Sequence, residues 1–102
     1  MIDIPLLISI AEIKKKASRH GSMSQRWWQN RIYGLQFGTL GDSFSLSYAF
    51  VLEAIRGTET ALENPKVSRS AKNNLRGYLN GLRDAKLAIE QRQKEGVVNG
   101  HL

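Results

Sequence analysis

Apolar residues recur at helical spacing through the last third of the chain. They lie at steps of three and four, at Ala71, Leu75, Tyr78, Leu82, Ala85 and Ile89. At about 100° per residue these positions fall within about 80° of one another, which predicts an amphipathic helix with one buried face. Asn64 and Pro65 precede the pattern as a cap and a favoured first-turn proline. Gly96 is expected to end the helix and to leave 97–102 as a flexible tail.

A shorter helix is predicted at the start of the chain. Asp3 is a candidate N-cap, and Pro5 suits the first turn. The apolar positions of this segment follow steps of four, three and four, at Leu6, Ile10, Ile13 and Ala17. We expect this face to pack against the rest of the protein. We also expect the helix to end near Gly21, because glycine readily adopts the left-handed conformation that closes a helix.

The segment from Asp42 to Glu63 has two interpretations. One pattern alternates as in a strand, at Phe44, Leu46, Tyr48 and Phe50. Another has helical spacing, at Tyr48, Leu52, Ile55 and Leu62. We favour a helix capped by Asp42 or Ser43, because the run continues without a break through 53–56. The alternative is an α+β fold with a β-hairpin over about 31–50.

Together these elements predict an all-α protein with a single helical domain over 1–95. Its centre is an antiparallel helix pair, 43–63 and 66–94, against which an N-terminal helix packs. A chain of 102 residues with 41% hydrophobic residues is able to form one modest core. Gly77 and Gly81 lie inside the last helix, where each costs about 1 kcal/mol relative to alanine, so we expect a compensating close contact. That contact is either with another helix of this chain or with a partner.

Composition excludes several kinds of site. The chain has no cysteine, which rules out disulfides and thiolate metal sites, and His20 and His101 offer little for acid–base or metal chemistry. Ser43, Ser45 and Ser47 have no neighbouring histidine to activate them. We therefore expect a protein that is not an enzyme and that uses no cofactor and no metal. No apolar run approaches the roughly 20 residues that span a bilayer, so we expect a cytoplasmic protein with no membrane partner.

Charge is distributed unevenly along the chain, which has a net charge of +6. Counting Lys and Arg against Asp and Glu, residues 1–41 carry +4, residues 42–63 carry −3 and residues 64–102 carry +5. The acidic middle segment is expected to attract the basic segments on both sides of it. The outward faces of the basic segments stay positive, and they favour anionic partners.

Cations of the last helix form the strongest candidate surface. Arg69, Lys72, Arg76 and Arg83 fall within about 60° of one another, beside the apolar face. A stripe of this kind neutralises phosphates, and arginine in particular binds phosphate or carboxylate with two parallel hydrogen bonds. The alternative is an ordinary solvated helix face.

Both tryptophans lie in the stretch SQRWWQNRIYG, residues 24–34. If this stretch is helical, Trp28 and Leu35 share one face while Trp27 and Arg31 share an adjacent one, so that one ring packs inward and the other stays partly exposed. Trp27 and Arg31 are therefore candidate contacts, because Trp and Arg dominate the energetics of interfaces and aromatic rings stack on unpaired bases. The alternative is that both rings belong to the core.

These observations favour a small, basic, non-enzymatic binding protein. We hypothesise a regulatory or inhibitory protein, of the kind that phages and other mobile elements encode, which acts on a larger protein or nucleoprotein complex of the host. The alternative is direct binding of DNA or RNA by the basic helix face, and a third alternative is a homodimer joined through the apolar face of the last helix. A helix-turn-helix is disfavoured, because the match is confined to Val67–Ser70 and Lys72 replaces an apolar core position of that motif.

Overall fold

The computed structural model describes residues 3–39 and 44–100, and these residues fold into four helices. The helices are α1 (Ile4–Ala17), α2 (Met23–Phe37), α3 (Phe44–Glu63) and α4 (Arg69–Gly100). No strand occurs among the described residues, so the all-α prediction is confirmed. The alternative β-hairpin is wrong, because 31–37 belong to α2 and 44–50 belong to α3.

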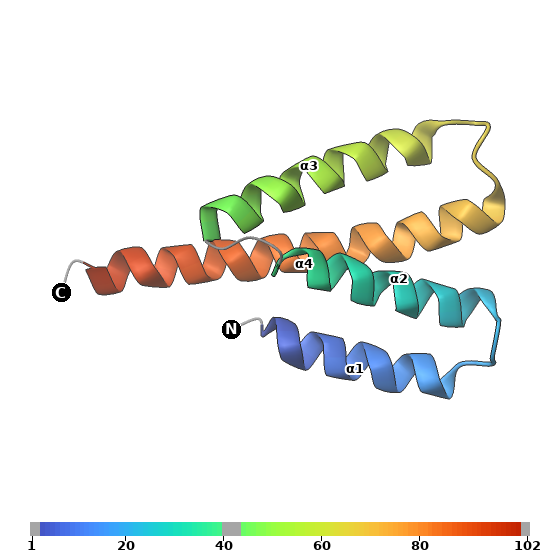
Figure 1. The fold of residues 1–102 in the computed structure, drawn as a ribbon, viewed down its shortest axis with the longest axis horizontal. Coiled ribbons are helices and arrows are strands. Elements are labelled where there is room, and N and C mark those ends of the chain that lie inside the picture. The colour runs from blue at the N-terminus through green and yellow to red at the C-terminus, as the bar shows by residue number, and fades with distance from the viewer. Residues whose placement is uncertain (1–2, 40–43, 101–102) are drawn as a thin grey trace.

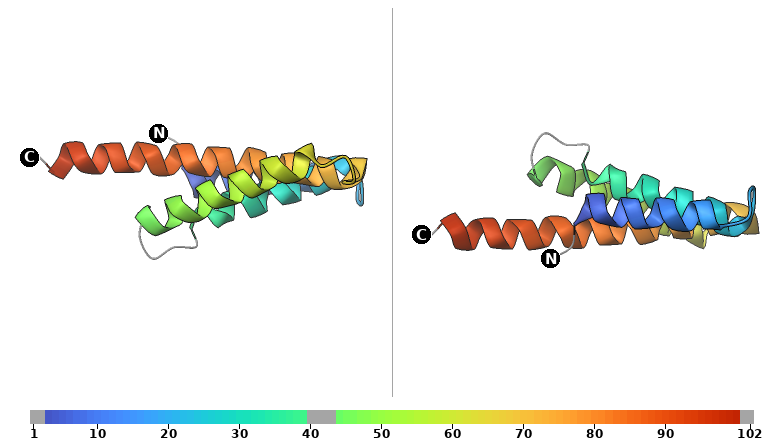
Figure 2. Two further views of the ribbon diagram at one scale, coloured as in Figure 1. Left: turned by 90° about the horizontal axis from the view of Figure 1, so that it is seen from above. Right: turned by 90° about the horizontal axis from the view of Figure 1, so that it is seen from below.

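The helices form two antiparallel hairpins that lie side by side (Figure 1). The hairpin α3–α4 is the antiparallel pair that the sequence predicts, whereas α1 packs mainly on α2 in the other hairpin. α2 runs parallel to α4 and makes the most extensive helix–helix contact in the molecule with it. The molecule is flat, at 50 × 31 × 18 Å, and both hairpin turns lie at the same end. Views from above and below place α4 on one face, with α2 and α3 toward the other (Figure 2).

Glycines allow α2 and α4 to approach closely. A Cβ atom on Gly81 would collide with the carbonyl oxygen of Arg31 and would lie 2.9 Å from the backbone nitrogen of Leu35. A Cβ atom on Gly34 of α2 would likewise lie 2.8 Å from the backbone nitrogen of Leu82. Backbone therefore packs on backbone, which compensates for glycines that intrinsic helix propensity disfavours. Of the two alternatives for the glycines of the last helix, contact with another helix of the same chain is confirmed.

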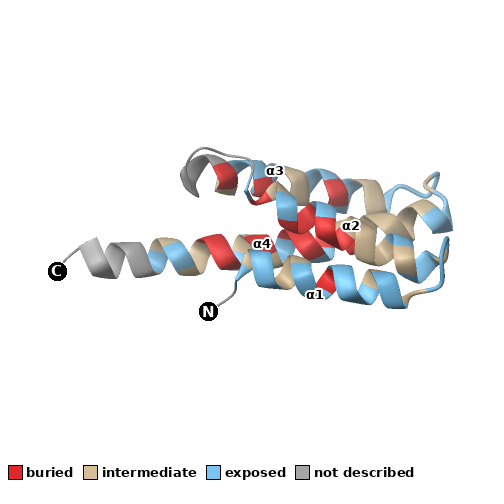
Figure 3. Cartoon of the chain, turned by 60° about the horizontal axis from the view of Figure 1, so that its bottom comes forward, coloured by how far each residue is buried: buried red, intermediate tan, exposed pale blue. Residues whose placement is uncertain are grey.

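The predicted apolar face of α4 is fully buried over its second half, whereas Ala71, Leu75 and Tyr78 are partly buried. Leu82, Ala85 and Ile89 are at most 2% exposed, and they form a core cluster with Val51 of α3. Leu35 of α2 is also fully buried, and its backbone lies against Gly81 of α4. Buried residues gather in the middle of the molecule, where α2, α3 and α4 meet (Figure 3).

The start of α4 differs from the prediction. Its N-terminal cap is Ser68, whose hydroxyl accepts a hydrogen bond from the backbone N–H of Ala71 at 3.1 Å. The Asn64 side chain instead accepts from the backbone N–H of Lys66 at 2.9 Å, within the loop that follows α3. The carbonyl oxygen of Asn64 accepts a hydrogen bond from the backbone N–H of Val67 at 3.2 Å. Pro65 is thus the second residue of a β-turn, a position that its fixed φ favours, and Asn64 serves this turn rather than a helix start.

Two further predicted boundaries concern the end of α4 and the start of α3. Gly96 does not end α4, which continues to Gly100, so the predicted helix end is wrong. The flexible tail stays a prediction. One interior glycine costs about 1 kcal/mol, which a helix of 32 residues tolerates because hydrogen bonds continue on both sides of it. The predicted caps of α3, Asp42 and Ser43, lie outside the described residues.

α1 begins as predicted but buries a different face. The Asp3 side chain accepts a hydrogen bond from the backbone N–H of Leu6 at 3.3 Å, which confirms Asp3 as the N-cap. The buried residue of α1 is Ala11, whose small side chain lets the helix approach its neighbour. The apolar stripe that includes Ile10 and Ile13 is exposed instead. Much of α1 is coloured as exposed in Figure 3. The prediction that this stripe packs against the rest of the chain is therefore wrong, because α1 lies at the edge of the molecule and turns its other side to α2.

Candidate functional site

Both hairpins turn at the same end of the molecule (Figure 1). The turns and the helix starts at this end carry cations that form no ion pair with a described residue. We define the basic end by the cations of the two turns and of the helix starts that follow them, which are Arg19, Arg26, Lys66, Arg69, Lys72 and Arg76. Two hydrogen bonds hold the starts of α2 and α4 together. Arg26 Nη2 donates to Ser70 Oγ at 3.4 Å, and Asn73 Nδ2 donates to the carbonyl oxygen of Met23 at 2.9 Å. α3 also brings an exposed carboxylate to this end, that of Glu63.

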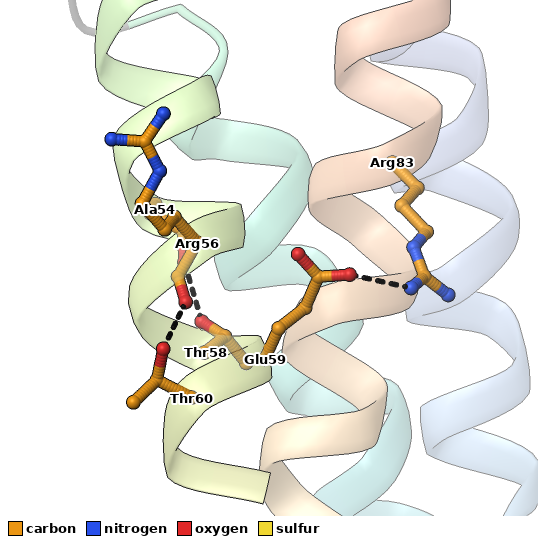
Figure 4. Close-up of polar contacts among 6 residues, drawn as sticks. All are labelled: Ala54, Arg56, Thr58, Glu59, Thr60 and Arg83. Atoms are coloured by element: carbon orange, nitrogen blue, oxygen red, sulfur yellow. Dashed lines mark hydrogen bonds and ion pairs between the residues drawn. The ribbon is translucent and has the colours of Figure 1, made fainter. Parts of the chain in front are cut away.

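Three of the four cations predicted on the last helix are free of internal partners. The side chains of Arg69, Lys72 and Arg76 form no ion pair and no hydrogen bond with any other described residue. Arg83 differs, because its Nη2 atom donates to Glu59 Oε2 of α3 at 3.2 Å (Figure 4). Both side chains of that pair are at least half exposed, so the pair contributes at most about 1 kcal/mol. Arg83 is thus weakly held at the margin of the candidate surface.

Arg31 is not available as a surface contact. Its side chain is 11% exposed, and its Nη1 atom lies 2.8 Å from Asp84 Oδ2. The same Nη1 atom donates to Asn80 Oδ1 at 2.6 Å. Both partners belong to α4, so the charge of Arg31 is neutralised within the α2–α4 contact. This finding corrects the assignment of Arg31 to the contact surface.

The two tryptophans pack against each other. The ring centroids of Trp27 and Trp28 lie 4.9 Å apart and the ring planes meet at 83°, an edge-to-face arrangement that aromatic pairs prefer. Both residues are partly buried, so the expected division into one inward and one outward ring does not hold. The backbone of Trp27 also lies directly against Gly77 of α4. Trp27 therefore serves the packing of α2, and only part of its surface is left for a partner.

Local helix electrostatics explain one group of cations and leave another unexplained. Lys14 and Lys16 lie in the last turn of α1, where cations suit the negative end of the helix dipole. Arg26, Arg69 and Lys72 lie instead at or near the starts of α2 and α4, neither of which has an acidic residue in its first turn. A cation at the positive end of a helix is unfavourable by about 0.3–1 kcal/mol. The basic end therefore concentrates positive charge that the fold itself does not neutralise.

Charged residues farther along α4 pair with one another. The Tyr48 hydroxyl donates to Glu90 Oε2 at 2.7 Å, and Lys86 Nζ lies 3.1 Å from the same oxygen. Hydrogen bonds from Tyr48 and Lys86 lower the pKa of Glu90 below its usual value. The hydrogen bond to Glu90 raises the pKa of Tyr48 and also that of Lys86. This cluster is balanced in charge, in contrast to the basic end.

The tertiary fold adds cations that the sequence did not single out. Arg19, Arg26 and Lys66 belong to the two turns, and their place beside the start of α4 follows from the way the hairpins pack. The signal present in the sequence was the pair of basic segments around an acidic one. That pattern predicts attraction between segments, but it does not reveal which cations remain unpaired.

Comparison with known proteins gives no family for this chain. No protein-family model, no curated protein and no solved structure matches it. Among the residues that the structure describes, no group of three or more His, Cys, Asp or Glu side chains is placed to hold a metal ion. Within those residues, too, no helix has the length and apolar character needed to cross a bilayer.

Proposed function

We propose that this protein is a non-enzymatic binding protein whose basic end contacts the phosphate backbone of nucleic acid. The observation that carries the proposal is the row of unpaired cations Arg69, Lys72 and Arg76, beside which the turn between α1 and α2 adds further cations. Lys and Arg side chains that neutralise phosphates release condensed counterions, which drives association. A bound phosphate also offsets the repulsion between these cations and the positive ends of α2 and α4.

The spacing of the cations along α4 suits a phosphate backbone. Arg69 and Arg76 are seven residues apart, which is about 10 Å along the helix axis. This distance is about the axial rise of three nucleotides in one strand of a duplex. Cations on one helix face at this spacing are able to contact neighbouring phosphates along one strand of a duplex.

Duplex nucleic acid fits this surface better than a single strand. Proteins that bind single strands stack exposed aromatic rings on the bases, with about 1–3 kcal/mol for each base. The exposed aromatic residues of the described chain are Tyr33 and Phe50, and neither belongs to the basic end. Trp27 and Trp28 are partly buried and pack on each other. Phosphate contacts are therefore the main source of affinity in this proposal.

Fluorescence polarisation with a labelled duplex of about 20 base pairs, and with one of its strands alone, tests the proposal. We expect the duplex to bind at about 50 mM salt and to bind at least about 10-fold more weakly at 200 mM salt. The triple variant Arg69→Ala, Lys72→Ala, Arg76→Ala is expected to weaken binding by at least about 10-fold. The single strand is expected to bind no more tightly than the duplex.

A matched triple variant controls for the loss of net charge. Arg56→Ala, Arg92→Ala, Lys94→Ala removes three exposed cations that lie outside the basic end. We expect this variant to weaken duplex binding by less than about 3-fold, because non-local charge is screened beyond a Debye length of about 10 Å. Absence of binding at about 50 mM salt, or equal losses in the two triple variants, would contradict the proposal.

A second candidate function is favoured by a different observation. Leu6, Ile10 and Ile13 expose apolar side chains on the outer face of α1, and exposed apolar patches commonly mark sites of protein interaction. This feature favours a regulatory or inhibitory protein that acts on a larger protein or nucleoprotein complex. An origin in mobile elements, a cytoplasmic location and the absence of enzymatic activity stay predictions from the sequence, as does the homodimer.

A further inference from the structure

The outer face of α1 carries an apolar stripe that this chain leaves uncovered. Leu6, Ile10 and Ile13 are 57%, 44% and 67% exposed. With Ala17, which is also exposed, they fall within about 60° of one another around the helix. A helix at the edge of a protein normally turns such a stripe toward the core. The inward side of α1 is apolar as well, because Ile4, Leu7 and Ile8 are partly buried there around the buried Ala11. α1 is therefore apolar on two sides, and the fold covers one of them.

Cations border this stripe on both sides. Lys14 lies about 40° beyond Ile10 around the helix, and Lys16 lies about 60° beyond Ile13 on the other edge. Both lysines are exposed, and neither side chain forms an ion pair or hydrogen bond with another residue in the described ranges 3–39 and 44–100. Glu12 lies about 100° farther round than Ile13, away from the stripe. The surface is thus an apolar strip with positive borders.

We infer that this stripe binds an amphipathic helix of a partner protein, one whose apolar seam is bordered by Asp and Glu. Apolar anchors at i, i+4 and i+7, here Leu6, Ile10 and Ile13, are the spacing through which helices recognise one another. Carboxylates beside the partner's seam pair with Lys14 and Lys16, as charges beside a coiled-coil seam set the choice of partner. A second copy of this chain fits less well, because it brings another net charge of +6.

The inference does not depend on nucleic-acid binding, because none of its residues belongs to the basic end. Two matched pools of helical peptides, each about 21 residues long, test it against the full chain. Both pools vary Leu, Ile, Val and Met along one seam, and the bordering positions are Asp and Glu in one pool but Lys and Arg in the other. The best binders of each pool are then measured by fluorescence polarisation at about 150 mM salt. We expect those of the acidic pool to bind at least about 10-fold more tightly.

Three variants locate the binding surface. The double variant Ile10→Gln, Ile13→Gln is expected to weaken binding of the best acidic peptide by at least about 10-fold, because it removes exposed apolar anchors and leaves the core unchanged. The matched control Tyr33→Gln changes another exposed apolar side chain, on α2, and is expected to leave binding unchanged. The double variant Lys14→Glu, Lys16→Glu is expected to reverse the preference toward the basic pool.

Specific results would overturn the inference. It fails if neither pool yields a binder, if both pools bind equally, or if Tyr33→Gln weakens the peptide as much as the stripe variant does. Sedimentation of the protein at about 100 μM adds a further outcome. If the protein is a dimer and the double variant Ile10→Gln, Ile13→Gln is a monomer, then a second copy covers the stripe. This result would exclude an acidic helix of another protein as its occupant.

Discussion

Arg31 in α2 and Asp84 in α4 form an ion pair with an Nη1–Oδ2 distance of 2.8 Å at the contact between two parallel helices. The guanidinium is 11% exposed, and Asn80 accepts a second hydrogen bond from it at 2.6 Å. On the same stretch of α4, the missing side chain of Gly81 leaves room for the carbonyl oxygen of Arg31. One residue of α2 is thus held by its backbone and by its side chain, which fixes the register of α2 on α4.

Loss of the carboxylate is expected to destabilise the fold through the guanidinium that it leaves behind. We expect Asp84→Ala to lower the free energy of unfolding by about 2 kcal/mol, less than the loss of about 3–5 kcal/mol for a fully buried pair because Asp84 is about one-third exposed. The double variant Arg31→Met, Asp84→Leu is expected to be more stable than Asp84→Ala, since it leaves no unpaired charge. Urea unfolding followed by circular dichroism measures both.

An exposed pair supplies the control for that prediction. Glu53 and Arg56 lie 3.9 Å apart, and both side chains are 79% exposed. Glu53→Ala is therefore expected to change the free energy of unfolding by less than about 0.5 kcal/mol. If Asp84→Ala and Glu53→Ala lower the free energy of unfolding by similar amounts, the Arg31–Asp84 pair contributes no more than a surface ion pair.

The close backbone contact between α2 and α4 predicts opposite effects on stability when two helical glycines, Gly81 and Gly57, are replaced by alanine. A Cβ on Gly81 meets the backbone of Arg31 and Leu35, which has no room to yield, so Gly81→Ala is expected to cost about 3 kcal/mol. A Cβ on Gly57 in α3 would have no neighbouring atom within 4 Å. Gly57→Ala is expected to stabilise the protein by about 0.4–1 kcal/mol through helix propensity and chain entropy. We expect the melting temperature to fall in Gly81→Ala and to rise in Gly57→Ala, which thermal unfolding measures.

Local sequence signals predicted the parts of the fold that depend on one helix alone. The apolar positions of α4 identified the face that buries Leu82, Ala85 and Ile89, because the period of a helix fixes which residues share a side. Asp3 was predictable as a cap because its hydrogen bond closes three residues away. The same reasoning failed at Asn64, because an Asn–Pro pair suits the start of a β-turn as well as the start of a helix.

Features that depend on the packing of two helices were not predictable in the same way. The stripe through Leu6, Ile10 and Ile13 has the spacing of a buried face, yet α1 turns its other apolar side inward, the side that carries Ala11. The sequence predicted Arg31 to be a surface cation, because its partner Asp84 is 53 positions away. Glycine contacts between α2 and α4 bring the two residues together. The unpaired state of Arg69 and Arg76 likewise follows from the placement of α3, whose Glu59 reaches Arg83 and not them.

The cluster of Tyr48, Lys86 and Glu90 makes the stability depend on pH in the acid range. Hydrogen bonds from Tyr48 and Lys86 lower the pKa of Glu90 in the folded state, so the folded protein binds this proton less readily than the unfolded chain. The resulting stabilisation is complete above the usual carboxyl pKa of about 4.3 and is lost as the pH falls through the lowered value. We expect Glu90→Gln to remove this part of the acid dependence. Melting temperatures of both proteins from pH 3 to pH 6 test it, and parallel curves would contradict it.

The salt dependence of duplex binding distinguishes a phosphate contact from a general effect of charge. Each cation that neutralises one phosphate contributes about 0.9 to the slope of log K against log salt, so Arg76→Ala is expected to lower the magnitude of that slope by about 1. Arg83→Ala is expected to lower it less, because Glu59 already pairs with that guanidinium in the free protein. Titrations from about 50 to 200 mM salt give both slopes. A weaker affinity with an unchanged slope in Arg76→Ala would mean that Arg76 supports the surface without contacting a phosphate, and it would move the proposed contact away from the exposed face of α4.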